Sequence, residues 1–299
     1  TASRTLTVNN SGLTTFNNLN LSASATSYTL TVTGTGDVRV DGVIANGGSS
    51  TAGRLTKAGT GTLTLAGVNT YGGITTVNGG TLRLGVDGAL PTGAVVVNAT
   101  AASSTALLDL AGYDQTITTL TFGGTGAAAS SASNVATGAG TLTLGGTVTY
   151  AATNNPLGAT LSGLVNLGGA TRTFSVADST GTATELAVTA AISGTGGLTK
   201  TGTGNLLLAG ANSYSGDTTL SAGTLTVGHD SAFGAGTLIL NAGTLQGDGT
   251  ARAIGNAATL GGNITIAGAS DLTLGGKLTQ TANRTLTLTN SRLTRLGAA

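Results

Sequence analysis

Residues 55–90 read LTKAGTGTLTLAGVNTYGGITTVNGGTLRLGVDGAL, and residues 198–233 read LTKTGTGNLLLAGANSYSGDTTLSAGTLTVGHDSAF. The two stretches align without a gap and agree at 21 of 36 positions. Apolar residues alternate with Thr in short runs such as Leu63-Thr64-Leu65, and Gly-rich breaks separate the runs. Alternation with a period of two predicts short β-strands, and glycine supplies the positive φ angles that tight corners require. We therefore predict an all-β fold with no significant helix.

The recurrence of this strand-and-corner phrase decides between the all-β architectures. Shorter echoes of it occur at residues 140–144 and 236–240. Such repeats are typical of a solenoid, because each coil must bury its inner face against the next coil. With about 20–25 residues per coil, the chain would make roughly 12–15 coils. The sequence predicts one continuous parallel β-solenoid over residues 1–299, with Leu and Val inside, Thr outside, and Gly and Asn at the corners.

Composition excludes several classes of protein. The 299 residues include 51 Gly and 60 Thr but no Cys, Met or Trp, which excludes a disulfide scaffold and thiolate-bound metals. The balance of 12 Lys and Arg against 11 Asp and Glu argues against a nucleic-acid binder. No apolar run is long enough for insertion into a membrane. Because Met is absent, we expect Thr1 to follow a processing site or to begin a segment of a longer polypeptide, and the missing Cys suits export.

Residues 57–85 and 200–228 share the pattern K-x-G-x-G-x-L-x-L-x-G-x-N-x-Y followed by T-T-x-x-x-G-T-L-x-x-G. This pattern resembles the autotransporter-associated β-strand repeat, also called the passenger-associated transport repeat. The resemblance directly covers these two stretches, with looser agreement over the rest of the chain. It implies a right-handed parallel β-helix (β-solenoid) that is extracellular or on the bacterial cell surface, often as part of a large adhesin.

The two ends of the chain carry a second repeat. Residues 1–14 read TASRTLTVNNSGLT and residues 281–294 read TANRTLTLTNSRLT, with ten of fourteen positions in agreement. Neither end shows a polar cap, a Pro or a covering helix, which are the usual means of hiding an open solenoid edge. A bland alternative is that R-T-L-T is a common coil phrase. The predicted self-assembly strands are Arg4, Thr5, Leu6, Thr7 and Val8 at one end and Arg284, Thr285, Leu286, Thr287 and Leu288 at the other.

From these ends we predict a structural module of an extracellular filament or surface fibre, with units joined end to end by β-strand stacking. The partner would be the protein itself, as a head-to-tail homopolymer or a tandem covalent array. The alternative is an adhesin passenger domain of an autotransporter-like surface protein. It would bind glycans or cell-surface proteins through loops at residues 45–53, 99–105 and 123–140. The sequence indicates no enzyme, no cofactor, no metal and no nucleic-acid partner.

The sole histidine, His229, occupies the position where the first repeat has Val86, so the fold does not require it. No second His or Cys could complete a metal site with it. A nucleophilic site would need Ser231 and Asp230 to act with this one imidazole. We therefore interpret His229 as a surface or corner residue.

Sugar-cleaving solenoids use clustered carboxylates, and two pairs of Asp are candidates here. Asp37 and Asp41 share a strand face with Arg39, which favours a solvated trio of charges. Asp109 reads as an outward strand residue, and Asp114 lies in a turn. Neither pair is predicted to be catalytic.

Four residues recur at equivalent repeat positions and are predicted to form a structural corner ladder. Each Asn would turn a corner by hydrogen bonding to local backbone. Each Tyr would pack over that corner, with a ligand role as the alternative. The four residues are Asn69, Tyr71, Asn212 and Tyr214.

Overall fold

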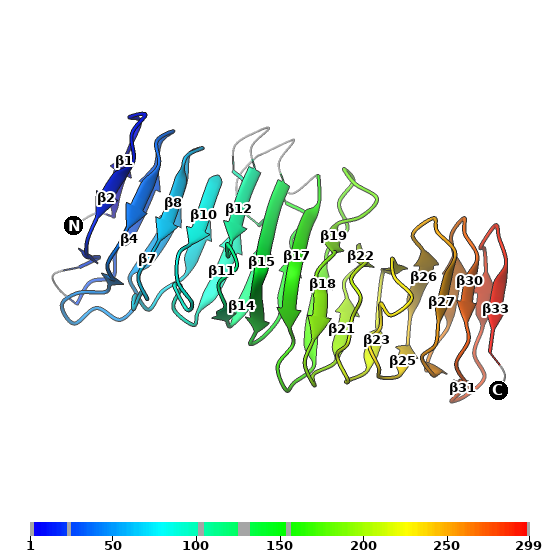
Figure 1. The fold of residues 1–299 in the computed structure, drawn as a ribbon. Helices are drawn as coiled ribbons and strands as arrows, with labels where there is room; N and C mark the ends of the chain where they lie inside the picture. Colours follow the sequence, from blue (N-terminus) through cyan, green and yellow to red (C-terminus); the bar gives the residue numbers. More distant parts are fainter. Residues whose placement is uncertain (1–2, 23–24, 101–104, 125–131, 154–156, 298–299) are drawn as a thin grey trace. The chain divides into compact units, whose positions relative to one another are not determined.

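The computed structural model describes residues 3–22, 25–100, 105–124, 132–153 and 157–297. Every regular element within these ranges is a β-strand, which confirms the predicted all-β fold. The described residues accordingly include no helix that could span a bilayer. The chain divides into two compact units, residues 1–146 with 151–159 (unit 1) and residues 147–150 with 160–299 (unit 2). In each unit, parallel strands stack coil upon coil as a β-solenoid (Figure 1).

Unit 1 has two main faces of parallel strands and one short third face. The first face contains β1 (Arg4–Thr7), β4 (Thr29–Thr33), β7 (Arg54–Lys57), β9 (Thr75–Val77), β11 (Ala94–Val97) and β14 (Thr119–Phe122). The second contains β2 (Thr14–Phe16), β5 (Val38–Val40), β8 (Thr62–Leu65), β10 (Gly80–Leu84), β12 (Thr105–Asp109) and β15 (Ala132–Leu144), with β13 (Gln115–Ile117) also pairing β15. The third pairs β3 (Leu19–Asn20) with β6 (Ile44–Ala45).

Unit 2 repeats this arrangement. Its first face contains β16 (Val148–Tyr150), β18 (Arg172–Val176), β21 (Leu198–Thr201), β23 (Thr218–Leu220), β25 (Leu238–Leu240), β28 (Ala258–Leu260) and β31 (Leu278–Gln280). The second contains β17 (Ala159–Asn166), β19 (Leu186–Val188), β22 (Asn205–Leu208), β24 (Thr224–Val227), β26 (Gly243–Gly247), β29 (Ile264–Ala267) and β32 (Leu286–Leu288), with β20 (Ala191–Ser193) pairing β17. The third contains β27 (Arg252–Ile254), β30 (Leu272–Leu274) and β33 (Thr294–Leu296).

The core of each unit is a ladder of apolar side chains that repeats once per coil. On the second face of unit 1, Val38 pairs with Leu63, which pairs with Leu82, and the ladder continues through Leu108 to Val135. All five residues are at most 1% exposed. Because parallel strands place register partners directly over one another, the alternating sequence puts one continuous apolar column inside the coils.

Thr forms the outer half of the same alternation. On the first face of unit 1, Thr5 pairs with Thr31, Thr31 with Thr56, and Thr56 with Thr76, and none of the four is buried. The sequence separation within each of these pairs is close to the predicted coil length. These observations confirm the predicted parallel solenoid with Thr outside. One continuous solenoid over residues 1–299 stays a prediction.

Candidate functional site

Each copy of the long internal repeat buries a lysine near the end of its first strand. Lys57 and Lys200 are 2% and 0% exposed. The Lys57 Nζ atom donates to two carbonyls of its own corner, at 2.6 and 3.1 Å, and to that of Gly79 in the next coil, at 3.2 Å. Lys200 makes three such bonds at 2.8, 2.8 and 3.2 Å. Burial lowers the pKa of each ammonium to about 8, although the nearby carboxylates of Asp37 and Glu185 oppose this shift. Both amines are therefore committed to holding corners together.

The repeated Asn residues tie three coils together. The Asn69 Oδ1 atom accepts a hydrogen bond from the Ile44 backbone N–H of the preceding coil, at 2.6 Å. Its Nδ2 atom donates to the Ala89 carbonyl of the following coil, at 2.6 Å, and to the nearby Gly67 carbonyl, at 3.1 Å. Asn212 makes the equivalent bonds to the neighbouring coils at 2.8 and 2.7 Å. The predicted local hydrogen bond is present for Asn69, but most hydrogen bonds of the two Asn side chains join neighbouring coils.

The two repeated Tyr side chains lie inside the core. Tyr71 and Tyr214 are 1% and 0% exposed, so the predicted packing over the corner is replaced by packing beneath it. Their hydroxyls share hydrogen bonds with Thr75 at 2.6 Å and Thr218 at 2.5 Å. Burial raises the pKa of both phenols above the ordinary value. Because both rings are buried, the structure shows no exposed ring surface for the alternative ligand role.

The first pair of candidate carboxylates is used in two different ways. The Asp37 Oδ1 atom accepts the Thr62 backbone N–H of the next coil at 2.8 Å. Arg39 and Asp41 form an ion pair at 2.5 Å, with side chains 41% and 47% exposed. The interpretation as solvated charges holds for Arg39 and Asp41, whereas Asp37 has a structural bond. The two carboxylates do not act on a common point.

The second pair behaves similarly. Asp109 lies 3.6 Å from Arg83 on the outer face and accepts the Ala111 N–H at 2.8 Å. Asp114 accepts the Thr141 N–H of the next coil at 2.7 Å. Aspartates at several corners therefore replace a missing backbone acceptor between coils. The described residues also contain no group of three His, Cys, Asp or Glu side chains that could hold a metal ion.

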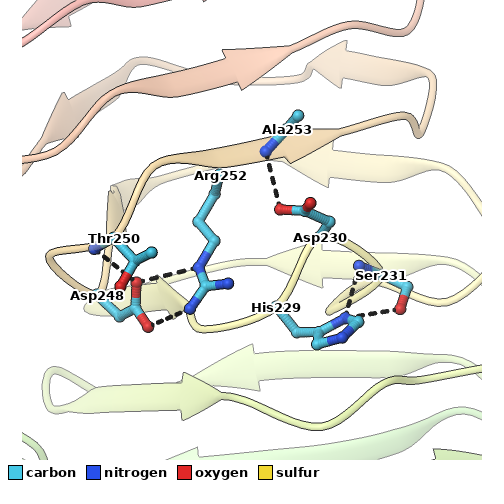
Figure 2. Close-up of polar contacts among 7 residues, drawn as sticks. All are labelled: His229, Asp230, Ser231, Asp248, Thr250, Arg252 and Ala253. Atoms are coloured by element: carbon cyan, nitrogen blue, oxygen red, sulfur yellow. Dashed lines mark hydrogen bonds and ion pairs between the residues drawn. The ribbon is translucent and has the colours of Figure 1, made fainter.

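The sole histidine lies in a turn of unit 2 and is half-buried. Its Nδ1 atom lies 2.8 Å from the Ser231 Oγ atom and 3.1 Å from the Ser231 backbone nitrogen (Figure 2). Asp230 points away from the imidazole and accepts the Ala253 N–H at 3.0 Å (Figure 2). A catalytic triad needs the serine and the carboxylate on opposite ring nitrogens. His229 is thus a corner residue, as predicted.

A clamped arginine lies beside this turn. Arg252 donates through Nε and Nη2 to the two carboxylate oxygens of Asp248, at 3.1 and 2.6 Å (Figure 2). The side chains are 19% and 23% exposed. Mainly because of this bond, the pKa of Asp248 is lowered and that of Arg252 is raised. Asp248 also accepts the Thr250 N–H at 3.1 Å, which fixes the carboxylate.

Sequence reasoning missed a buried polar stack in unit 2. Glu185, 2% exposed, accepts the Asn205 backbone N–H at 2.6 Å. The Asn205 Oδ1 atom accepts from the Thr226 hydroxyl at 2.7 Å, and Thr226 Oγ1 accepts from Gln246 Nε2 at 3.0 Å. The one feature of the sequence that could have pointed to this stack is that Glu185 is the single Glu of the chain. This stack joins four successive coils.

The predicted binding loops have mixed outcomes. Ala45 ends β6, and residues 46–53 form the connection to β7, in which the Asn46 side chain accepts the Gly53 N–H at 2.9 Å. The central parts of the other two loops, residues 101–104 and 125–131, lie outside the described residues. Residues 132–140, predicted as loop, belong to β15 instead. Their alternation of buried and less buried side chains is a strand pattern that the Ala and Ser content obscured.

The two copies of the end phrase occupy different positions in the coil. Residues 4–7 form β1 and pair with β4 on the first face. At the other end the equivalent residues 284–287 lead into β32, which pairs with β29 on the second face. The following strands, β2 and β33, are offset in the same way. Stacking one phrase on the other would therefore join different faces, and end-to-end assembly stays a prediction.

Comparison with known proteins agrees with the resemblance. The passenger-associated-transport-repeat family model matches residues 55–84, 135–154 and 198–227. A 108-residue part of the chain is 41% identical to the adhesin BmaC autotransporter of Brucella suis biovar 1 (strain 1330), covering 34% of this chain and 3% of that protein. A 59-residue part is 51% identical to an extracellular serine protease of Serratia marcescens, covering 20% of this chain and 6% of that protein. The chain thus spans a small fraction of either relative.

No solved structure matches the chain significantly. The two full repeats contain the buried Lys, Asn and Tyr positions described above, and the Lys and Asn side chains among them make bonds between coils. This chain is therefore a β-solenoid in which three segments match the passenger-associated-transport repeat.

Proposed function

We propose that this chain is a passenger segment of a secreted bacterial protein, exposed at the cell surface, where it acts as a non-enzymatic adhesin module. The observation that carries the proposal is the passenger repeat, whose buried Lys and Asn side chains each make bonds to a neighbouring coil. A relative named as an autotransporter adhesin supports the choice of adhesion.

A passive role suits the chemistry of the described residues. The amines of Lys57 and Lys200 are enclosed by carbonyls, and the repeated Tyr rings are buried. The match to an extracellular serine protease covers 6% of that protein. In this chain the sole histidine contacts Ser231, whereas Asp230 accepts the Ala253 N–H and does not contact the imidazole. A stiff column of inter-coil bonds can instead carry a recognition surface away from the cell.

The charges of the first and last coils argue against the alternative in which units join end to end into a filament. Lys277, Arg284, Arg292 and Arg295 lie in the last coil, and no acidic residue follows Asp271 in the sequence. At the other end, Arg4 is the one charged residue that precedes Asp37. A joint between these coils would bring like charges together, which opposes edge-to-edge pairing. Joining units end to end stays a prediction.

The test uses the native organism and the purified chain. Antibodies against the chain should label intact cells, and beads coated with it should adhere to epithelial cells several times more than albumin-coated beads. Unlabelled cells, or beads that adhere no better than albumin, would overturn the proposal. Long polymers in electron micrographs of the purified chain would favour the filament.

A further inference from the structure

Two shallow depressions adjoin each other on the surface of unit 2, and Asp230 lines both. One has a volume of about 340 Å³ and is lined by Asp230, Ser231, Gly234, Ala235, Gly255 and Asn256. The other has a volume of about 260 Å³, and its lining includes Asp230, Arg252, Asp271, Thr273, Leu293 and Arg295. The first volume lies at the lower end of the range of small-molecule sites, about 300–1,000 Å³, and the second lies just below that range.

The depressions exist because small residues interrupt the outer surface of the third face. Ala253 pairs with Thr273, and Thr273 pairs with Arg295 on the last strand. Ala251 and Ala253 therefore form a low floor between larger neighbours. Gly255 adds open space, since a Cβ placed there would meet no atom within 4 Å.

The rim carries two anchored hydrogen-bond acceptors. One carboxylate oxygen of Asp230 accepts the Ala253 N–H at 3.0 Å, and one of Asp271 accepts the Leu293 N–H at 3.1 Å. These bonds fix both side chains. No described residue bonds the second oxygen of either carboxylate, so each has a strong acceptor to offer.

The rim also carries two guanidiniums and an apolar contact. Arg252 is held in place by Asp248, and this bidentate pair leaves its Nη1 donors uncommitted (Figure 2). Arg295 is exposed and faces the same depression. Leu293 is 54% exposed and offers a surface to C–H groups. Fixed donors and acceptors lower the entropic cost of binding.

The lining carries two carboxylates and two guanidiniums, and the guanidinium of Arg252 is already paired with Asp248, so neither sign of charge dominates the depression. A polyanion would be repelled by the carboxylates and a polycation by the guanidiniums. A neutral ligand rich in hydroxyls suits alternating acceptors and donors, since each hydroxyl both donates and accepts. We propose that the two depressions bind a neutral oligosaccharide, one sugar residue in each, with Asp230 between them. This inference rests on the proposed adhesin function and locates it in unit 2.

The experiment uses the whole purified chain and a printed array of oligosaccharides. The array holds neutral glycans of glucose, galactose, mannose, fucose and N-acetylhexosamines, together with sialylated and sulfated counterparts. Binding to a subset of neutral glycans is expected. Because His229 is the single histidine and contacts Ser231 in the lining, its imidazole proton resonance should shift on titration with a bound glycan. A silent array, or a preference for the anionic glycans, would overturn the proposal.

Two variants test the site with a matched control. Asp230→Asn keeps an acceptor for the Ala253 N–H but replaces the second oxygen with a donor. Arg295→Gln removes a guanidinium. Each should weaken glycan affinity by about tenfold or more, as expected for a lost charge-assisted bond. Asp217→Asn is the control, because Asp217 makes the same inter-coil bond to Thr237 at 2.8 Å outside both depressions. Unchanged affinity in both site variants would contradict the assignment.

The same proteins on beads separate this inference from the proposed function. Cell adhesion that persists undiminished with Asp230→Asn would reject the site and leave the adhesin function standing. Glycan binding by the soluble chain without any bead adhesion would support the site and reject the adhesin function. If the wild-type chain shows neither glycan binding nor bead adhesion, the proposed site and the adhesin function are both rejected.

Discussion

Lys57 and Lys200 should make the two units more stable as the pH rises from 7.5 to 10. Burial lowers the pKa of each lysine from 10.5 to about 8. Below pH 8 both the folded and the unfolded chain hold the proton. Between pH 8 and 10.5 the folded chain has released it and the unfolded chain still binds it, so the free energy of unfolding rises with pH.

The size of the effect follows from the pKa difference. One pKa unit corresponds to about 1.4 kcal/mol, so a change from 10.5 to about 8 corresponds to about 3 kcal/mol per lysine. At pH 10 most of it, about 2 kcal/mol, should be realised in each unit. Above pH 10 the buried phenols of Tyr71 and Tyr214, whose pKa values are raised, reverse the trend because the unfolded chain ionises first.

Urea denaturation followed by far-ultraviolet circular dichroism at pH 7.5, 8.5, 9.5 and 10 measures this slope. Lys57→Met and Lys200→Met should each flatten the rise for one unit, because Lys57 lies in unit 1 and Lys200 in unit 2. Lys277→Met, at an exposed position of the last coil, is the control and should leave the slope unchanged. A uniform loss of stability from unsatisfied carbonyls does not affect the slope.

A flat or falling stability between pH 8 and 10 in the wild type would refute the reasoning. It would mean that the three carbonyl oxygens around each Nζ atom compensate the ammonium for its lost hydration. An equal rise in the double variant would also refute it, because the titrating groups would then lie elsewhere.

Asn212→Ala tests the bonds between coils, and a pair of glycine variants tests how closely the coils pack. Asn212→Ala leaves the Ile192 N–H without its partner and leaves the Ala232 carbonyl with only the 3.4 Å bond from the Tyr214 hydroxyl. The free energy of unfolding, measured by urea denaturation, should fall by about 2–4 kcal/mol. A loss below about 1 kcal/mol would contradict the role of the ladder. Gly223→Ala places a Cβ 2.4 Å from a carbonyl oxygen at a φ of +71°, so it should abolish or severely weaken folding, whereas Gly255→Ala, with open space, should be nearly neutral by thermal denaturation. Similar melting temperatures for the two Gly variants would contradict this packing.

The strands were predictable because alternation is a local signal. The alternation of a few neighbouring residues predicts that Leu63 points into the core and Thr64 points outward. The burial and register of the two residues confirm this. The buried lysines were not predictable in this way. Lys57 stands in a Gly-rich, polar stretch of sequence, and only the next coil supplies the Gly79 carbonyl that completes its shell.

The sequence also did not predict on which face of the solenoid a repeated segment lies, because this depends on residues far away in the chain. Coil lengths vary, since the register pairs Leu63 with Leu82 in one place and Gln115 with the more distant Leu142 in another. The position of any strand therefore depends on the sum of all preceding coils and insertions. The phrase R-T-L-T at residue 4 lies on the first face, while its copy at residue 284 leads into β32 on the second. Identical local sequence does not imply an identical place in the coil.

The candidate glycan site was hidden for the same reason. Asp230, Ala253 and Arg295 lie in three separate stretches of sequence that only the register brings together. At these outer positions Ala251, Ala253 and Gly255 leave space that larger side chains would fill. The proposed site thus depends both on small residues at outer positions and on an inter-coil bond, because Asp230 is fixed by the Ala253 N–H of the next coil.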